Sequence, residues 1–321
     1  MSSALVNKYN HLVTVLICCI GVFVFEIQAK AQINHVHKGL NEVNDACSSS
    51  PVDCITLVER ELARTPKNTY IWYDLLQHKF DALFDLQKMR QLKEEITPWI
   101  DQKKLPNSFL ITVYIYYSKT SYLASNITDA KQYAYKAKEK ILALNQVFPS
   151  PMRLIMLANL QMNLDEPESA YEVLKALETK YKQSKNAYFM MELYGNLAHV
   201  TRILSLPEES LAYWIKTLPW SLEYNNLQQI GTVLLNLGMA YLTLDNYTEA
   251  ETYLLESKGY SQRGKDFTKV NQAQFYLIKS KLGQGQYQQA KKLYQALELE
   301  LLPDIYGERI TVLKKEISSI H

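Results

Sequence analysis

Glycine and proline are scarce in this chain, with ten of each among 321 residues. Ordinary usage is about 7% for glycine and about 5% for proline, so both fall short. β-Sandwiches and doubly wound α/β enzymes need many turn glycines, and collagen-like chains need far more. The shortage argues against these classes. Because 47% of the residues are hydrophobic, a disordered or low-complexity chain is excluded as well.

The chain also lacks a charge of one dominant sign. Thirty-five Lys and Arg face 33 Asp and Glu, which leaves a formal net charge of +2. A nucleic-acid-binding protein normally carries a basic stripe, so the composition predicts no nucleic-acid partner. Length alone suggests about two domains of roughly 150 residues.

Residues 1–31 have the features of a secretory signal peptide. Lys8 precedes an apolar run at residues 12–25, LVTVLICCIGVFVF, which is too short to cross about 30 Å of hydrocarbon comfortably. Ala29-Lys30-Ala31 then forms an A-x-A cleavage pattern before Gln32. We therefore expect an exported protein, periplasmic or secreted. The alternative is an uncleaved N-terminal anchor, which would be the only membrane contact.

Cysteine is rare too, with four in the chain, and Cys18 and Cys19 lie within the predicted signal peptide. Cys47 and Cys54 remain as an even pair in an exported chain, where such pairs normally form a disulfide. We predict an N-terminal cap at residues 32–68 in which this disulfide clasps the N-terminal segment onto the first helix. The alternative of a redox pair is disfavoured because the spacing is not C-x-x-C.

A repeat with a period of 40 residues organises most of the chain. Five short polar turns are each followed by a small residue, and these residues recur in steps of 40: Ala130, Ala170, Ser210, Ala250 and Ala290. Before Ala250, apolar and small residues share one helix face, and Asp245-Asn246 then breaks that helix. The unit is therefore predicted as helix, tight turn, helix. Gly238 and Ala250 would let the two helix backbones approach closely.

This unit resembles the tetratricopeptide repeat (TPR) family. The family motif places bulky residues at repeat positions 4, 7, 11 and 24 and small residues at positions 8, 20 and 27. One unit matches all seven, with Leu234, Leu237, Gly238, Tyr241, Ala250, Leu254 and Ser257. The resemblance covers residues 69–302 and implies an all-α fold, a right-handed superhelix (α-solenoid) of antiparallel helix pairs. The 40-residue period departs from the family's usual 34, so longer helices or longer linkers are expected.

The last segment, residues 303–321, is predicted to form a C-terminal capping helix. Ile305, Ile310, Leu313 and Ile317 fall on one face of this segment, and charged residues fall on the other. A terminal helix with a polar outer face is what an open-ended stack of repeats requires for solubility. The chain is therefore predicted to form one stack of helix pairs rather than two globules.

Catalytic and metal-binding motifs are largely missing from the sequence. It contains no G-x-S-x-G elbow, no P-loop, no H-E-x-x-H and no G-x-G-x-x-G. His35 and His37 form an H-x-H, but two nitrogens do not complete a metal site. We therefore predict no catalytic residue, no metal and no cofactor. N-x-T triplets begin at Asn126 and Asn246, where helix capping is favoured and glycosylation stays open.

The resemblance implies a binding groove on the concave face of the stack. In the TPR family, groove residues come from repeat positions 2, 5, 6, 9, 12 and 13. The matching candidates here are Asn159, Met162, Asn196, His199, Arg202, Asn236, Met239, Tyr276 and Lys279, and the same rule places Glu192 there. Carboxamides can both donate to and accept from a peptide backbone. Methionine adapts to irregular apolar partners, and the cations can pair with carboxylates.

Four tyrosines, Tyr114, Tyr116, Tyr117 and Tyr122, crowd one predicted helix. Their spacing spreads them over more than one face, so some must point outward. Exposed tyrosine is common at binding surfaces, and tyrosine at a helix–helix seam is equally ordinary. The sequence leaves both possibilities open.

The sequence thus favours an exported TPR-like scaffold that binds a protein or peptide in its groove. One alternative is a periplasmic sensory or ligand-binding module of a signalling system. Another is an exported enzyme with a pocket inside the superhelix. A deep pocket that joins His199, Arg202 and Tyr276 would favour the enzyme, and an open groove would favour the scaffold.

Overall fold

The computed structural model describes residues 39–48, 50–102 and 104–319. The predicted signal peptide at residues 1–31 lies outside this range, as do His35 and His37. The chain divides into two compact units, Met1–Asp45 and Ala46–His321. In the first unit the described residues are helical. All elements below belong to the second unit.

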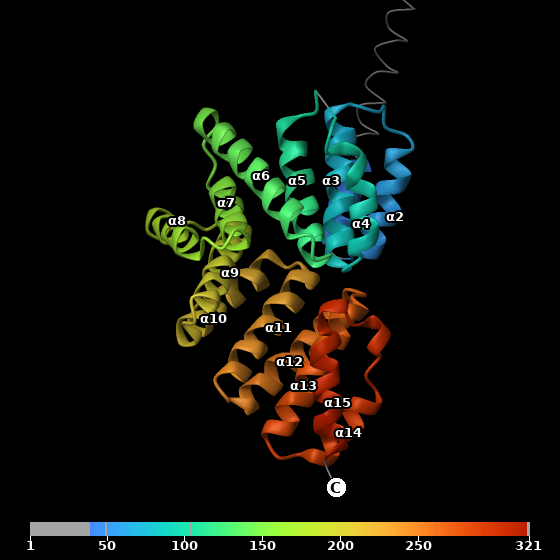
Figure 1. The fold of residues 1–321 in the computed structure, drawn as a ribbon, viewed down its shortest axis with the longest axis vertical. Coiled ribbons are helices and arrows are strands. Elements are labelled where there is room, and N and C mark those ends of the chain that lie inside the picture. The colour runs from blue at the N-terminus through green and yellow to red at the C-terminus, as the bar shows by residue number, and fades with distance from the viewer. Residues whose placement is uncertain (1–38, 49, 103, 320–321) are drawn as a thin grey trace, which may run out of the picture. The chain divides into compact units, whose positions relative to one another are not determined.

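The second unit consists of helices joined by short turns, and the described residues contain no strand (Figure 1). The predicted all-α class is therefore confirmed. The helices are α2 (Pro51–Leu62), α3 (Tyr70–Asp85), α4 (Met89–Ile96), α5 (Asn107–Leu123), α6 (Ile127–Val147), α7 (Pro151–Asn163), α8 (Pro167–Lys180), α9 (Ala187–Ile203), α10 (Pro207–Tyr224), α11 (Leu227–Thr243), α12 (Tyr247–Arg263), α13 (Phe267–Gly283), α14 (Tyr287–Gln295) and α15 (Gly307–Ser318).

From α5 onward, consecutive helices pack as antiparallel pairs that stack on one another. Each helix contacts the next along the chain, and α3 contacts α5, α7 contacts α9, and α11 contacts α13. The second helices of the pairs, α6, α8, α10, α12 and α14, begin at residues 127, 167, 207, 247 and 287, in steps of 40. The chain therefore folds as the TPR-like α-solenoid of helix pairs that the sequence predicted.

Each of these pairs turns through one residue in the left-handed backbone region. These residues are Ser125, Asp165, Ser205, Asp245 and Gly285, with φ between 56° and 71°. Only one of the five is glycine, although this region disfavours residues with a Cβ. The shortage of glycine therefore does not mean that the turns avoid this conformation.

The residue after each left-handed position precedes the next helix and serves as its N-cap. At Asn126 the side-chain oxygen accepts a hydrogen bond from the backbone N–H of Asp129, at 3.2 Å. At Asn246 no side-chain capping bond forms. The capping prediction is therefore confirmed for Asn126 and wrong for Asn246.

The contact between α11 and α12 is as close as the small residues suggested. A Cβ added to Gly238 would lie 2.6 Å from Cγ of Leu254 and 3.3 Å from the carbonyl oxygen of Ala250. Both Ala250 and Leu254 are fully buried. The predicted close approach of these helices is confirmed, and it leaves no room for a side chain at position 238.

The two ends of the second unit are fixed in different ways. A disulfide joins Cys47 to Cys54 of α2, as predicted, and α2 packs on α3. At the C-terminus, Leu313 and Ile317 of α15 are buried, whereas Ile305 is 59% exposed. The prediction for Ile305 is wrong because residues 304–306 form a separate 3-10 turn before α15 begins.

Candidate functional site

Four cavities lie along the first helices of the pairs, α5, α7, α9, α11 and α13. We call the surface that carries them the groove face, and number the cavities I to IV in chain order. Their volumes are about 360, 640, 50 and 560 Å³. Cavities I and II share Lys119 and Asn159. Cavities II and III share His199 and Arg202, and cavities III and IV share Met239.

The residues that the TPR resemblance placed in a groove all line these cavities. Asn159 and Asn196 line cavity I, and Met162, His199 and Arg202 line cavity II. Asn236 and Met239 line cavity III, whereas Tyr276 and Lys279 line cavity IV. None of these four cavities joins His199 and Arg202 to Tyr276.

Tyr276 contributes to packing more than to an open surface. Its side chain is 7% exposed, and its ring contacts Phe275 and Tyr306 edge-on. Its hydroxyl accepts a hydrogen bond from Nη1 of Arg309 on α15, at 2.9 Å. These contacts tie α13 to α15, so Tyr276 shapes the wall of cavity IV from within the core.

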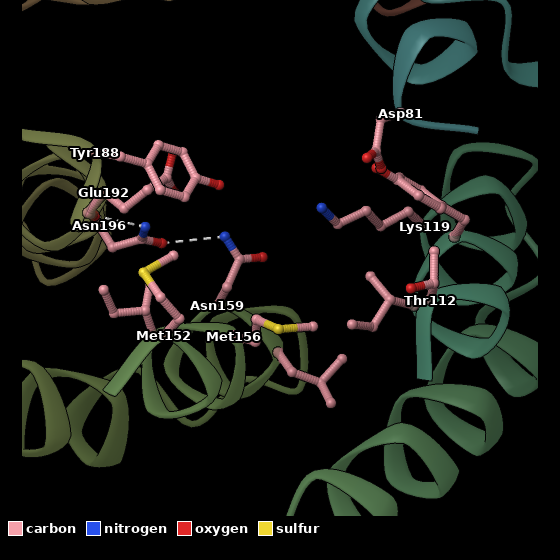
Figure 2. A pocket seen from close by; sticks show the side chains of 13 residues that line it. Asp81, Thr112, Lys119, Met152, Met156, Asn159, Tyr188, Glu192 and Asn196 are labelled. Atoms are coloured by element: carbon pink, nitrogen blue, oxygen red, sulfur yellow. Dashed lines mark hydrogen bonds between the residues drawn. The ribbon is translucent and has the colours of Figure 1, made fainter. Parts of the chain in front are cut away.

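Two carboxamides link α7 to α9 at the base of cavity I. Nδ2 of Asn159 donates to Oδ1 of Asn196 at 3.1 Å, and Nδ2 of Asn196 donates to the carbonyl oxygen of Glu192 at 2.8 Å. Figure 2 shows this chain of hydrogen bonds beside the sulfur atoms of Met152 and Met156. Asn196 is thereby held in place, while Oδ1 of Asn159 keeps its capacity to accept a hydrogen bond.

His199 and Arg202 form the boundary between cavities II and III. The His199 imidazole lies edge-on to Trp214, with ring centroids 4.9 Å apart. Burial, together with the positive charges of Arg202 and Lys119, lowers the pKa of His199 to about 4. The imidazole is therefore neutral near pH 7 and can both donate and accept a hydrogen bond. Arg202 stays exposed and charged.

Cavity I also contains five polar side chains that the groove prediction did not include: Asp81, Thr112, Tyr116, Lys119 and Tyr188. For four of them a signal was present. In the unit around Ala130, the groove positions of the TPR pattern fall on Thr112, Tyr116 and Lys119, among others. Asp81 falls on groove position 12 of the earlier unit, in which Tyr73, Leu76 and Phe80 hold positions 4, 7 and 11. Tyr188 has no such signal, because it reaches the cavity from the first turn of α9.

The tyrosine cluster on α5 divides between two environments. Tyr114 and Tyr117 both pack against Tyr133 of α6, with ring centroids 5.5 and 4.5 Å apart. Tyr116 lines cavity I and Tyr122 lines cavity II. One helix therefore carries tyrosines of both kinds, two at a helix–helix seam and two at the cavities.

The charges in cavity I lie on opposite walls. Asp81 and Lys119 come from α3 and α5, and Glu192 comes from α9 across the cavity (Figure 2). The Tyr116 hydroxyl donates a hydrogen bond to Oδ1 of Asp81. The surrounding protein raises the pKa of the Asp81 and Glu192 carboxyls and lowers the pKa of the Lys119 ammonium by desolvation. In each case burial outweighs the nearby charges of opposite sign.

Two other kinds of site were sought among the described residues. In this part of the chain, no three His, Cys, Asp or Glu side chains are grouped so that they could hold a metal ion. No helix there combines the length and the apolar character needed to cross a bilayer.

Comparison with known proteins shows the fold of this chain. No protein-family model and no curated protein sequence matches it. A Rap protein complexed with Competence and Sporulation Factor is 16% identical, with a TM-score of 0.57 over 82% of this chain and 75% of that chain. Aspartyl phosphate phosphatase F from Bacillus subtilis is 14% identical, with a TM-score of 0.56 over 88% and 80%. At these identities the likeness shows a shared helical-repeat architecture and no shared activity.

Proposed function

We propose that this protein is a scaffold that binds a peptide segment of a partner along its groove face. The observation that carries the proposal is the line of cavities on the first helices, each sharing wall residues with the next. A line of connected cavities suits an extended segment better than it suits one compact molecule. Recognition by a preformed surface, without catalysis, is the mechanism.

The chemistry of the groove face supports a peptide as the ligand. Asn159, Asn196 and Asn236 provide carboxamides along three successive first helices, and peptide backbones offer matching donors and acceptors. Met152, Met156 and Met239 add adaptable apolar surface between them. The Rap protein of similar fold is complexed with Competence and Sporulation Factor, which is consistent with a recognition role for this architecture.

The experiment that tests the proposal is selection from a random peptide library with the full chain, followed by affinity measurement on purified variants. Arg202→Ala and Asn236→Ala are each expected to weaken a selected peptide about fivefold to tenfold, the loss of one hydrogen bond or ion pair. Arg90→Ala is the matched control, because Arg90 is exposed on α4 away from all four cavities.

Equal affinity of a selected peptide for the wild type and for both groove variants would show that the peptide binds elsewhere. Failure to select any peptide would contradict the proposal as a whole. Binding that depends on Arg202 or Asn236 but not on Arg90 would support it. Thermal unfolding of each variant separates lost binding from lost folding.

We also propose that the protein is exported, to the periplasm or out of the cell. The apolar run before Ala29-Lys30-Ala31 and the pairing of Cys47 with Cys54 support this, because disulfides persist in oxidising compartments. Intact mass of the protein made in its own host is expected to correspond to a chain that begins near Gln32. A chain that keeps residue 1 and has both thiols free would overturn the proposal.

A further inference from the structure

Two opposite charges face each other across cavity I without meeting. Lys119 extends from α5 toward the middle of the cavity, and Glu192 lies on the opposite wall, on α9 (Figure 2). Within the described residues, neither side chain takes part in a hydrogen bond or an ion pair. Lys119 instead lies over two aromatic rings, 4.6 Å from the centroid of Phe84 and 5.8 Å from that of Tyr116.

Elsewhere in the chain, some half-buried lysines are paired with a carboxylate. Lys79 bonds Glu95 at 2.7 Å, Lys138 bonds Glu166 at 2.6 Å, and Lys281 bonds Glu251 at 2.5 Å, and these lysine side chains are between 11% and 23% exposed. Others lie over aromatic rings without an ion pair among the described residues: Lys93, Lys136 and Lys279. Lys119 is half-buried too, yet its carboxylate is missing.

Leaving both charges unpaired is unfavourable in the free protein. A charge that is removed from water loses hydration energy, which an opposite charge or a hydrogen bond restores. The desolvation of Lys119 and Glu192 therefore marks a site whose partners come from outside the chain. Asp81 lies on the same wall, accepts the Tyr116 hydroxyl and is the carboxylate whose charge acts most strongly on Lys119, but no hydrogen bond or ion pair joins Asp81 to Lys119.

The remaining lining of cavity I suits a short stretch of peptide. Met152, Ile155 and Met156 form an apolar floor, and Oδ1 of Asn159 is available to accept a main-chain N–H. The volume of about 360 Å³ lies within the range of small-ligand sites, about 300–1,000 Å³. Lys119 is the single cation among the residues that line cavity I, so it is the one group there that can form an ion pair with an incoming carboxylate.

We infer that cavity I binds a peptide segment with one carboxylate and one cationic group, the carboxylate on Lys119 and the cation on Glu192. The inference rests on the proposed function and makes it specific, because it gives the ligand a charge pattern and a direction. The two charges come either from side chains or from the free ends of a short peptide, and both sources present the same chemistry to the cavity.

The test uses pools of octapeptides with acetylated and amidated ends, in which one lysine and one aspartate are separated by one to four alanines. Matched pools replace the lysine by glutamine, the aspartate by asparagine, or both. Unblocked polyalanine peptides test the free ends as the source of charge. Affinities are measured by titration calorimetry with the full chain.

We expect the blocked pool with both charges, or the unblocked peptides, to bind at least about tenfold more tightly than the uncharged blocked pool. Lys119→Gln and Glu192→Gln should each abolish this advantage. Lys182→Gln and Glu172→Gln are matched controls, exposed and outside all four cavities, and should retain it.

The double substitution K119E/E192K is the most discriminating variant, because it exchanges the two charges and keeps their sum. Wild-type protein should prefer one order of lysine and aspartate along the peptide, and the exchanged protein should prefer the other. Equal binding of charged and uncharged peptides, or an order preference that survives the exchange, would overturn the inference but not the proposed function. Binding of no peptide at all would overturn both.

Discussion

The N-terminal region around cavity I, from α3 to α9, and the C-terminal region, from α11 to α15, are built from the same repeat, and each contains, among its described residues, both paired and unpaired lysines. In the C-terminal region Lys281 of α13 bonds Glu251 at 2.5 Å, and Gln284 donates to the same carboxylate at 2.9 Å. In the N-terminal region Lys119 of α5 faces cavity I without such a partner. Lys281 and Lys119 occupy different positions of the repeat. The counterpart of Lys119 in the C-terminal region is Lys279, which among the described residues also has no carboxylate partner and lies over the Phe275 ring, 6.0 Å from its centroid. The contrast is therefore between two positions of the repeat.

The two regions differ at the helix crossing nearest the turn. Between α11 and α12, Gly238 and Ala250 let the chains meet without polar contact at this crossing. Between α5 and α6, the hydroxyl of Ser118 instead donates to the carbonyl oxygen of Ala130 at 2.7 Å. One crossing depends on close packing and the other on a buried hydrogen bond. Substitutions should distinguish them.

The largest effect is expected at the close-packed crossing. Gly238→Ala should lower the free energy of unfolding by about 2–3 kcal/mol, because the added methyl group overlaps the buried Leu254 side chain. Gly259→Ala is the control, since a Cβ there meets nothing within 4 Å. That variant should gain roughly 0.5–1 kcal/mol from helix propensity. Urea unfolding measures both, and similar values for the two variants would contradict the packing difference.

Removing the lysine of each region should affect stability very differently. Lys281→Met should cost about 2 kcal/mol, because Glu251, whose side chain is 25% exposed, loses its charged partner. Lys119→Met should change stability by less than about 0.5 kcal/mol or increase it, since no ion pair is lost. Chemical unfolding of both variants provides the measurement. A loss at Lys119 as large as that at Lys281 would mean that Lys119 has a partner in solution.

A smaller effect is expected at the hydrogen-bonded crossing. Ser118→Ala should cost about 1 kcal/mol, because the buried carbonyl oxygen of Ala130 loses a donor. Ser169→Ala is the control, as Ser169 is exposed on α8. If the two variants unfold at the same urea concentration, the hydroxyl of Ser118 contributes nothing to the crossing.

The smallest effect is a pH dependence in the N-terminal region. Burial raises the pKa of Asp85 to about 7, against the counteracting charges of Lys269 and Lys119, and Asp81 and Asp266 add to the increase. The folded state thus binds this proton more tightly than the unfolded state, so stability falls as pH rises from about 4 to about 7. Asp85→Asn should therefore raise the Tm at pH 8, where the carboxyl group is charged, and leave it almost unchanged at pH 4.

Asp101→Asn serves as the control for this pH effect, because Asp101 is an exposed residue next to a turn. Calorimetric melting temperatures at several pH values measure both variants. A benefit of Asp85→Asn that is the same at pH 4 and pH 8 would show that the carboxyl group does not titrate in this interval. A benefit that increases toward low pH would reverse the expected sign.

Much of the fold could be predicted because repeat proteins form their contacts between neighbours in sequence. The step of 40 residues and the small residues Gly238 and Ala250 give the helix pairs, since each pair packs against the next. The outcomes at Asn246 and Ile305 were not predictable in this way. A cap and a first helical residue depend on backbone angles at one or two positions, which periodicity does not report.

The groove residues show the same limit. Asn159 and Asn196 could be placed on the groove face from their repeat positions, and the same positions extend to Lys119. Their hydrogen bond to each other depends on how α7 and α9 are stacked. Asp81 enters cavity I from α3, at groove position 12 of the unit in which Tyr73, Leu76 and Phe80 hold positions 4, 7 and 11, whereas its hydrogen bond from Tyr116 depends on how α3 and α5 pack.

The sequence by itself determined the all-α class, the helix–turn–helix unit and the pairing of Cys47 with Cys54, because these depend on short-range periodicity and spacing. Its shortage of glycine indicated helices, but it did not show that Ser125, Asp165, Ser205 and Asp245 would adopt left-handed turns. Only the tertiary structure decided which lysine is paired and which is not. Pairing depends on the distance between helices that are remote in sequence, and no local pattern encodes that distance.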